Sequence, residues 1–226
     1  MLFNYRLSYL LLMLLFALSC ANNEADQLTW VKENYKGKQY RKLAVVCVNE
    51  SKKVRKKFRK RIVRALKAKG VQAASGKDLF PDGLTEEDKD PEHFIGRLNS
   101  QDVDGVLVAF IVREKTMPEK RAKVKGEGVY WVGSFVYRRL TIDYQDDQDG
   151  EEEEEEEEIQ ESFIIETVLH DVSKDLAKKK ETLVWRNFSD IVKDTTTKVT
   201  AQQFADSLAV QLLEKDQVVK LCCPDN

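Results

Sequence analysis

Histidine and cysteine are scarce in this sequence, which limits the metal sites and disulfides that it can form. Of its 226 residues, 2 are histidine and 4 are cysteine. His93 and His170 have no cysteine or carboxylate near them at metal-ligand spacing, so we expect both to be structural and predict no metal site. Beyond Cys20, the remaining cysteines are odd in number and imply no complete disulfide framework. Cys47 lies in a run of valines and is expected to be a small buried apolar residue.

Motifs that mark catalytic sites are also absent from the sequence. It contains no glycine-rich phosphate loop, no HExxH pair and no nucleophile elbow. Serine, histidine and aspartate are present, but no spacing groups them into a catalytic arrangement. We therefore expect a protein with no catalytic residue and no cofactor, and we keep an unrecognised hydrolase as an alternative.

A long hydrophobic run occurs once, at the start of the chain. Residues 7–18 are almost wholly apolar, follow a single charge at Arg6 and end at Ser19 and Cys20. The run is too short for a comfortable membrane span, which takes about 20 residues, and it suits the core of a signal peptide of about 7–15 residues. Its end resembles the lipobox of bacterial lipoproteins, which implies a signal peptide over residues 1–19 and a lipid on Cys20. An ordinary cleavable signal and an uncleaved anchor are the alternatives.

A lipid on Cys20 would place the protein on a membrane of the cell envelope. Acyl chains hold a soluble domain there because each buried methylene contributes about 0.8 kcal/mol. We expect the outer membrane, with the domain facing the periplasm. The polar residues 20–40 would serve as a tether that reaches about 65 Å when fully extended.

Acidic residues are unevenly distributed along the chain. After the leader, 36 basic residues stand against 39 acidic ones, and 12 of the acids lie between Asp143 and Glu158 with no basic residue among them. The rest of the mature chain therefore has 36 basic and 27 acidic residues. Eight consecutive glutamates repel one another and have nothing to bury, so residues 146–158 are predicted to be a solvated loop.

Basic residues gather in a predicted helix at residues 52–69. This stretch contains 11 Lys and Arg residues and no acid, and it lies between a Ser51 cap and Gly70. Such a stripe is typical of contact with nucleic acid or another anionic surface. The candidate binding residues are Arg55, Lys56, Arg59 and Lys60.

An exported lipoprotein rarely meets nucleic acid, so we exclude nucleic acid as the partner of this helix. Anionic lipid headgroups, an anionic glycan or an acidic envelope protein remain. The alternative is a solvated helix face, or a face that the protein's own acidic run neutralises.

The remaining apolar patterns predict an α/β fold. Strands are predicted at residues 42–48, 71–75, 104–112, 129–144, 159–172 and 182–188. Helices are predicted at residues 52–69, at 91–99 behind an Asp90 cap, and from Thr200 onward. Alternation of strands and helices followed by a run of strands predicts a mixed sheet packed against two or three helices. The strands 129–144 and 159–172 would form a long hairpin with an acidic tip, within one domain over residues 41–219 and before a tail at 220–226.

The ordered body resembles a group of small bacterial envelope lipoproteins. The resemblance rests on residues 42–46 followed at once by the helix 51–69, on Asp102–Val108 after a short helix, and on Leu183–Arg186 before a final amphipathic helix. Their domain is similar to the amino-terminal domain of TolB and to the penicillin-binding-protein activator lipoproteins. The resemblance implies a non-catalytic domain and brings no catalytic residues with it.

Together these features predict a membrane-tethered envelope lipoprotein that acts as a non-catalytic binding or assembly-accessory domain. Its partners would be the membrane, through the lipid, and an envelope protein or anionic glycan. A structural envelope subunit that oligomerises through sheet edges or through Cys222 and Cys223 is the alternative from another class.

Overall fold

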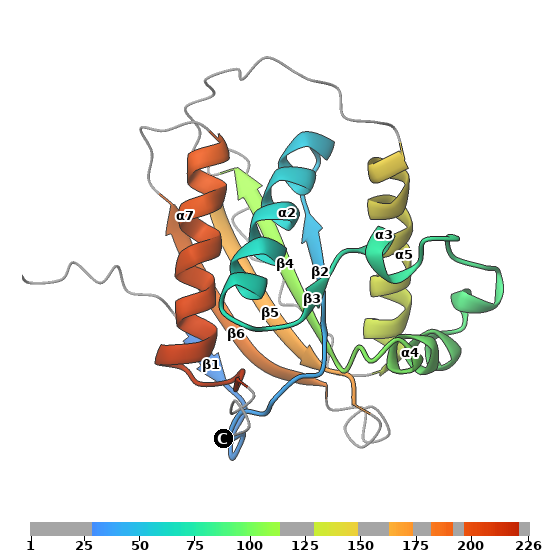
Figure 1. Cartoon of the computed structure of the whole chain (residues 1–226), viewed down its shortest axis with the longest axis horizontal. Helices are drawn as coiled ribbons and strands as arrows, with labels where there is room; N and C mark the ends of the chain where they lie inside the picture. Colours follow the sequence, from blue (N-terminus) through green and yellow to red (C-terminus); the bar gives the residue numbers. More distant parts are fainter. Residues whose placement is uncertain (1–28, 114–128, 149–162, 174–181, 192–196, 222–226) are drawn as a thin grey trace, which may run out of the picture.

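One mixed β-sheet with helices on both faces forms the protein (Figure 1). The computed structural model describes residues 29–113, 129–148, 163–173, 182–191 and 197–221. The strands are β1 (Thr29–Val31), β2 (Leu43–Val48), β3 (Ala73–Ala74), β4 (Gly105–Arg113), β5 (Phe163–Asp171) and β6 (Leu183–Ile191). The helices are α2 (Lys52–Ala68), α3 (Gly76–Leu79), α4 (Pro91–Ser100), α5 (Val129–Gln148) and α7 (Thr197–Val210), with short turns η1 (Glu87–Lys89) and η3 (Gln211–Lys215). The predicted α/β class is confirmed, with more helices than the two or three expected.

The six strands follow the order β1-β6-β5-β4-β2-β3. β2 pairs in parallel with both β3 and β4, as strands joined by helical crossovers do. The other pairs, β4 with β5, β5 with β6, and β6 with β1, are antiparallel. The sheet is therefore parallel in one half and antiparallel in the other.

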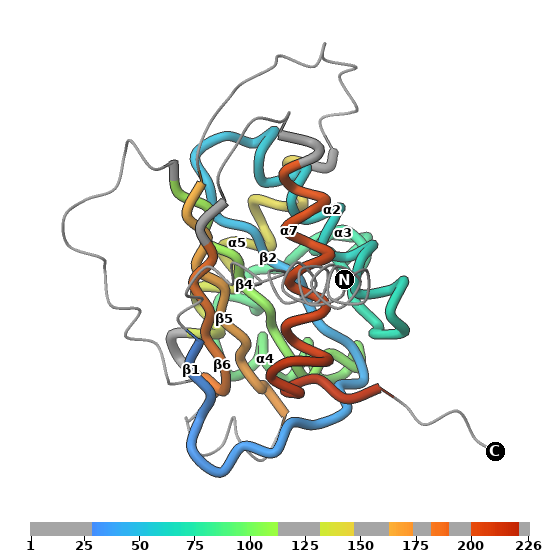
Figure 2. Tube along the Cα trace, turned by 90° about the vertical axis from the view of Figure 1, so that its left-hand side faces the viewer, coloured from blue at the N-terminus to red at the C-terminus, as the bar shows by residue number. Residues whose placement is uncertain are grey.

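Two hydrophobic cores cover the two faces of the sheet. Phe58 of α2 and Phe204 of α7 pack with Trp185 on one face. Phe94 of α4 and Val136 of α5 belong to the core on the other face. Turned by 90°, the trace shows α7 standing to one side of β1, β5 and β6 (Figure 2). The fold thus has three layers, with the sheet in the middle.

The predicted caps of α2 and α4 are confirmed. The Ser51 hydroxyl accepts a hydrogen bond from the Val54 backbone N–H at 3.4 Å, and Gly70, at a φ of 84°, follows the helix. The Asp90 carboxylate accepts from the His93 backbone N–H at 2.7 Å. These side chains satisfy backbone donors that a helix leaves unpaired at its first turn.

The predicted strand over residues 129–144 is wrong, because these residues form α5. Val132, Val136, Leu140 and Asp143 are buried, and they recur at intervals of four, four and three residues along one helix face. Valine and aromatic residues favour strands when read alone, but packing against a neighbouring element overrides this preference. The acidic-tipped hairpin is wrong for the same reason: β5 pairs with β4 and β6 instead.

The ordered domain begins before residue 41, where the tether was expected to end. β1 pairs with β6, Lys38 bridges to Val219, and Tyr40 is buried. β1 was not predicted from the sequence, because a strand of three residues is too short to show a clear apolar pattern. α7 likewise begins at Thr197, before the cap predicted at Thr200.

Several predictions concern residues outside the described ones. These are the signal peptide, Cys20, the glutamates of the acidic run after Gln148, and the tail cysteines Cys222 and Cys223. Among the helices that the structure describes, none has the length and apolar character needed to cross a membrane.

The approach of α5 to α4 depends on Gly133. A Cβ atom there would lie 2.6 Å from the Pro91 carbonyl oxygen, which real Cβ atoms do not tolerate. Gly133→Ala should therefore destabilise the fold by about 1–3 kcal/mol. Gly96→Ala on α4 is the matched control: it meets no heavy atom within 4 Å and should be neutral or stabilising by up to about 1 kcal/mol. Chemical denaturation measures both, and equal effects of the two variants would contradict this packing.

Candidate functional site

The parallel strands β2 and β4 create a crevice at their carboxyl ends. The chain leaves β2 into α2, which packs on one face of the sheet. The next described helix after β4 is α5, which packs on the other face. Where helices that follow neighbouring parallel strands diverge to opposite faces, a crevice opens outside the strand ends, and ligands of α/β proteins commonly bind there.

The crevice contains a hollow of about 530 Å³. Residues 48–51 after β2 and residues 110–112 near the end of β4 line it, together with Arg55 of α2 and Arg139 of α5. Small-molecule sites occupy roughly 300–1,000 Å³, so this volume admits a ligand the size of a substituted ring. We call it the carboxyl-end hollow.

Arg55 is held in place on one side of the hollow by five hydrogen bonds. Its Nη2 and Nε donate to the Asp146 carboxylate at 2.7 to 3.0 Å. Its Nη1 donates to the backbone carbonyl oxygens of Asn49 at 2.8 Å and Glu50 at 3.1 Å. Arg55 thus ties α5 to the loop that follows β2, and its charge is compensated by Asp146.

A second ion pair lies deeper between the same helices. Arg59 Nη1 is 2.6 Å from Asp143 Oδ1, and the side chain of each residue is 1% exposed. Cys47 on β2 is fully buried nearby, and burial, followed by the negative charge of Asp143, raises the pKa of its thiol well above the usual value. A thiol in this state stays protonated and unreactive.

These two ion pairs lie along the free part of β2. β3 pairs with Leu43 and Ala44 only, so among the described residues the rest of β2 has no strand partner on that side. α2 and α5 lie on opposite faces of the sheet, yet their side chains meet, so the contacts must pass around this edge. Covering an exposed edge with helices removes a site for unwanted strand pairing.

Arg55 and Arg59 do not lie on the outer surface of the basic helix, where contact with an anionic surface would require them. They are 9% and 1% exposed, whereas Lys56 is partly buried and Lys60 is exposed. The structure therefore separates the four candidate binding residues: Arg55 lines the hollow, Arg59 lies in the interior, and the two lysines lie outside the hollow. Asp143 and Asp146 belong to the acidic stretch, so that stretch neutralises part of the basic helix, one of the alternatives considered for it.

Arg139 is the functional candidate that sequence reasoning missed. Among the described residues no ion pair joins it to a carboxylate, and its Nε is buried without a hydrogen-bond partner. Burial, then the nearby charge of Arg55, lowers the pKa of its guanidinium. The group stands 5.5 Å from the centre of the Phe135 ring. The Asp143 carboxylate offsets the effects of burial and of Arg55 only in part, so Arg139 is a cation at the hollow without an ion-pair partner among the described residues.

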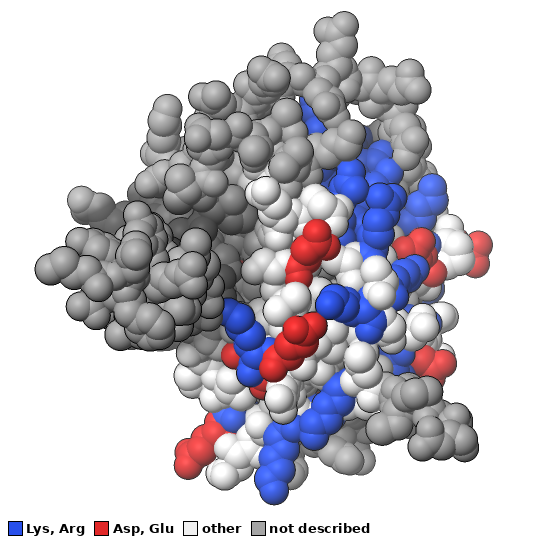
Figure 3. All heavy atoms as spheres, turned by 60° about the vertical axis from the view of Figure 1, so that its left-hand side comes forward, with Lys and Arg blue, Asp and Glu red and all other residues white. Residues whose placement is uncertain are grey.

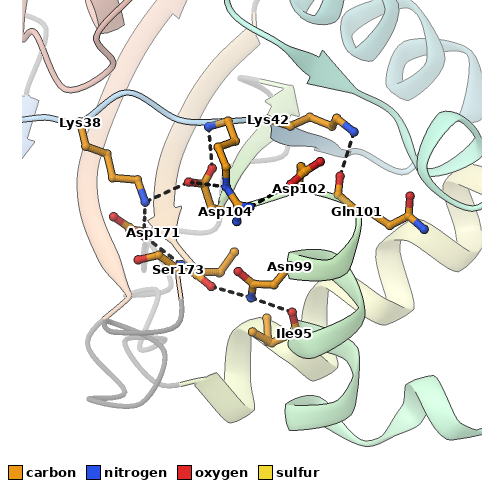
Figure 4. Close-up of polar contacts among 11 residues, drawn as sticks. Lys38, Lys42, Ile95, Asn99, Gln101, Asp102, Asp104, Asp171 and Ser173 are labelled. Atoms are coloured by element: carbon orange, nitrogen blue, oxygen red, sulfur yellow. Dashed lines mark hydrogen bonds and ion pairs between the residues drawn. The ribbon is translucent and has the colours of Figure 1, made fainter. Parts of the chain in front are cut away.

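A polar cluster occupies the opposite end of the sheet (Figure 4). Lys38 Nζ lies 3.0 Å from Asp171 Oδ1 and 3.3 Å from Asp104 Oδ2, and Asp104 also accepts from the Arg41 backbone N–H at 3.0 Å. Arg41 in turn contacts Asp102 at 2.8 Å. These contacts attach the segment between β1 and β2 to the ends of β4 and β5, which is a structural role.

His170 on β5 is fully buried. Its Nδ1 lies 3.2 Å from the Thr182 hydroxyl. Burial, with a smaller effect from Arg186, lowers its pKa to about 3. The imidazole is therefore neutral at neutral pH and is poorly placed to exchange protons with a ligand. His93 is exposed on the surface of α4, and the described residues contain no group of three His, Cys, Asp or Glu that could hold a metal.

Basic side chains also cover part of the outer surface. Figure 3 shows Lys and Arg gathered on the upper right of the view, with acidic side chains scattered elsewhere. On α2, Arg64 and Lys67 are exposed, and Arg61 donates to Gln202 of α7 at 3.0 Å. The outer face of α2 is thus solvated and partly attached to α7.

Comparisons with known proteins found only weak similarity to the solved structures described below. No family model and no curated protein matches this chain. Among solved structures, the PelC dodecamer from Paraburkholderia phytofirmans is 12% identical, covers 86% of this chain and 99% of its own, and has a TM-score of 0.39. A single-substitution variant of the same PelC dodecamer is also 12% identical, covers 86% of this chain and 97% of its own, and has a TM-score of 0.40. Matches this distant do not show what the present chain binds.

The Arg59–Asp143 pair should be a large contributor to stability when one partner is removed. Arg59→Met leaves a buried carboxylate without its cation and should cost about 3–5 kcal/mol. The double variant Arg59→Met with Asp143→Leu removes both charges and should recover most of the loss. Arg64→Met, at an exposed position of the same helix, should change stability by less than about 0.5 kcal/mol. Denaturant unfolding of these three variants and of Asp143→Leu alone gives all four values, and a loss in the double variant equal to the sum of the losses in Arg59→Met and Asp143→Leu would contradict a coupled pair.

Proposed function

We propose that the chain is a lipid-anchored protein of the cell envelope whose domain binds a partner and does not transform it. The anchor would be a lipid on Cys20, with the domain facing the periplasm from the outer membrane. The observation that carries the proposal is the carboxyl-end hollow. It is large enough for a ligand, and its lining contains two arginines, the polar residues 49–51 and apolar residues from β2 and β4, without histidine or cysteine.

The reactive groups of the described residues support binding over catalysis. Cys47 and His170 are buried within the sheet. The Ser51 hydroxyl serves as the cap of α2. Of the carboxylates near the hollow, Asp146 is held by Arg55, while Glu50 is exposed. A nucleophile next to a positioned base, which hydrolysis requires, is not found among these residues.

The described chain begins at a part of the fold away from the hollow. The chain enters the described domain at β1, an edge strand, whereas the hollow lies at β2 and β4, beyond β6 and β5. Eight residues lie between Cys20 and Thr29, and that length of chain spans at most about 30 Å. An anchored domain would therefore stay close to the membrane while the hollow remains away from the attachment strand.

A second candidate function, self-association, has its own observation. Among the described residues the outer side of β1 pairs with no other strand, and Trp30 on this strand is 46% exposed. Edge strands with exposed apolar residues can pair with another chain. The structural-subunit alternative therefore has a candidate surface at β1.

Removal of Cys20 tests the anchor. Cys20→Ala should release the protein from the membrane fraction and abolish incorporation of a labelled fatty acid, because no other acylated residue holds it there. Cell fractionation with fatty-acid labelling measures this, and Cys47→Ala serves as the cysteine control. Retention of the label and of the membrane fraction in Cys20→Ala would refute the lipoprotein proposal.

Crosslinking of intact envelopes separates the two functions. A binding domain should give crosslinks to foreign partners that persist in Trp30→Lys. A structural subunit should give self-products that disappear in Trp30→Lys and persist in Leu221→Lys. Leu221, 49% exposed, is the second large exposed apolar residue among those that the structure describes. Mass spectrometry identifies the products, and self-products without foreign partners would overturn the binding role.

A further inference from the structure

The carboxyl-end hollow has an electrostatic imbalance that a bound anion would correct. Within it, Arg55 is balanced by Asp146 through three contacts. Arg139 has no such partner among the described residues, and its Nε is enclosed without an acceptor. A buried donor left unpaired costs free energy, and the cost is greater when the group is charged. The site therefore lacks an acceptor that carries negative charge.

The surroundings add further attraction for an anion. The loop that lines the hollow leads directly into the first turn of α2, which contains Lys52 and Lys53 and no acid. Unpaired backbone N–H groups give the start of a helix a partial positive charge. The acid that lines the hollow without an arginine partner is Glu50, which is exposed and whose charge water therefore screens.

The shape of the hollow indicates more than a free ion. Phe110 and residues 111–112 give it an apolar wall, and the ring of Phe110 packs against that of Phe135 with the ring centres 5.8 Å apart and the planes tilted by 38°. Arg139 lies beside the same Phe135 ring. A ligand that fits would offer a ring to this wall and an anionic group to the guanidinium, whose planar fork suits a phosphate or carboxylate.

We propose that the carboxyl-end hollow binds a sugar carrying a phosphate or carboxylate group, and that Arg139 is the residue that recognises the anionic group. This rests on the proposed binding function and names its ligand class. Arg55 positions the wall of the site by holding the loop after β2, and the Asn49 and Glu50 carbonyls remain engaged by it. Arg139 is then the cation available to the ligand.

Titration calorimetry on the mature chain, in neutral detergent at physiological salt, tests the proposal. The probes are glucose 6-phosphate, glucuronate and neutral glucose. We expect one or both anionic sugars to bind, glucose to bind much more weakly, and the stronger of the two anions to identify the anionic group. Equal affinity for glucose, or no binding of any probe, would overturn the proposal while leaving partner capture by crosslinking unaffected.

Three variants assign the binding to the hollow. Arg139→Gln should weaken anion binding by roughly tenfold or more, because charge-assisted hydrogen bonds are the strong ones. Arg138→Gln removes the same charge from the neighbouring exposed position and should change affinity little. Glu50→Gln should strengthen binding. Circular dichroism confirms that each variant is folded, and equal losses in the Arg139 and Arg138 variants would show general charge attraction and refute the site.

Discussion

The ion pair between Arg59 and Asp143 fixes the arrangement on which the rest of this structure depends. It joins two helices that the sheet places on opposite faces. Moving both charges out of water costs several kcal/mol for each ion, which is offset only when the partners are held in a favourable geometry. The pair therefore contributes little net attraction but strongly disfavours any arrangement in which α2 and α5 slide or separate.

The second ion pair follows from the first. Arg55 lies four residues before Arg59 on α2, and Asp146 lies three residues after Asp143 on α5, so the two helices are antiparallel along the line of contact. One pair is fully enclosed, and the other reaches the carboxyl-end hollow. The same contact that covers the free edge of β2 thus forms one wall of the candidate binding site. Stability and site geometry are coupled through two consecutive turns of each helix.

Much of this fold could be predicted from the sequence, because local signals were strong where elements are capped or continuously apolar. The Ser51 cap and the basic amphipathic pattern predicted α2, and Asp90 before Pro91 predicted α4. The apolar runs that became β2 and β4 were equally clear. α5 could not be assigned from its residue types, since its valines and aromatic residues favour strands and only its contacts with α4 and β2 decide otherwise.

The candidate site was harder to predict, because its chemistry depends on pairing between distant segments. Charge counting treats the 11 basic residues of 52–69 as one stripe, yet two of them are compensated inside the protein. The available signal for this pairing was the spacing of two acids. Asp143 and Asp146 lie three residues apart and share one helix face with Leu140. This spacing becomes informative only once residues 129–148 are recognised as a helix.

Arg55 and Arg59 are paired with buried acids, whereas Arg139 is not, and this difference decides which arginine can be replaced to test a binding role. Replacing Arg55 or Arg59 with an acid would leave its buried partner, Asp146 or Asp143, next to a like charge. A loss of binding in such a variant would therefore indicate a damaged fold. Arg139 is partly buried and has no ion-pair partner among the described residues. Removing its charge relieves the cost of burial and the repulsion from Arg55, and each of these effects is larger than the attraction to Asp143 that is lost with them. A variant at Arg139 should therefore keep or gain stability while losing ligand. Opposite changes in stability and affinity indicate a residue retained for binding, because replacing a structural arginine would lower both the stability of the protein and its affinity for the ligand.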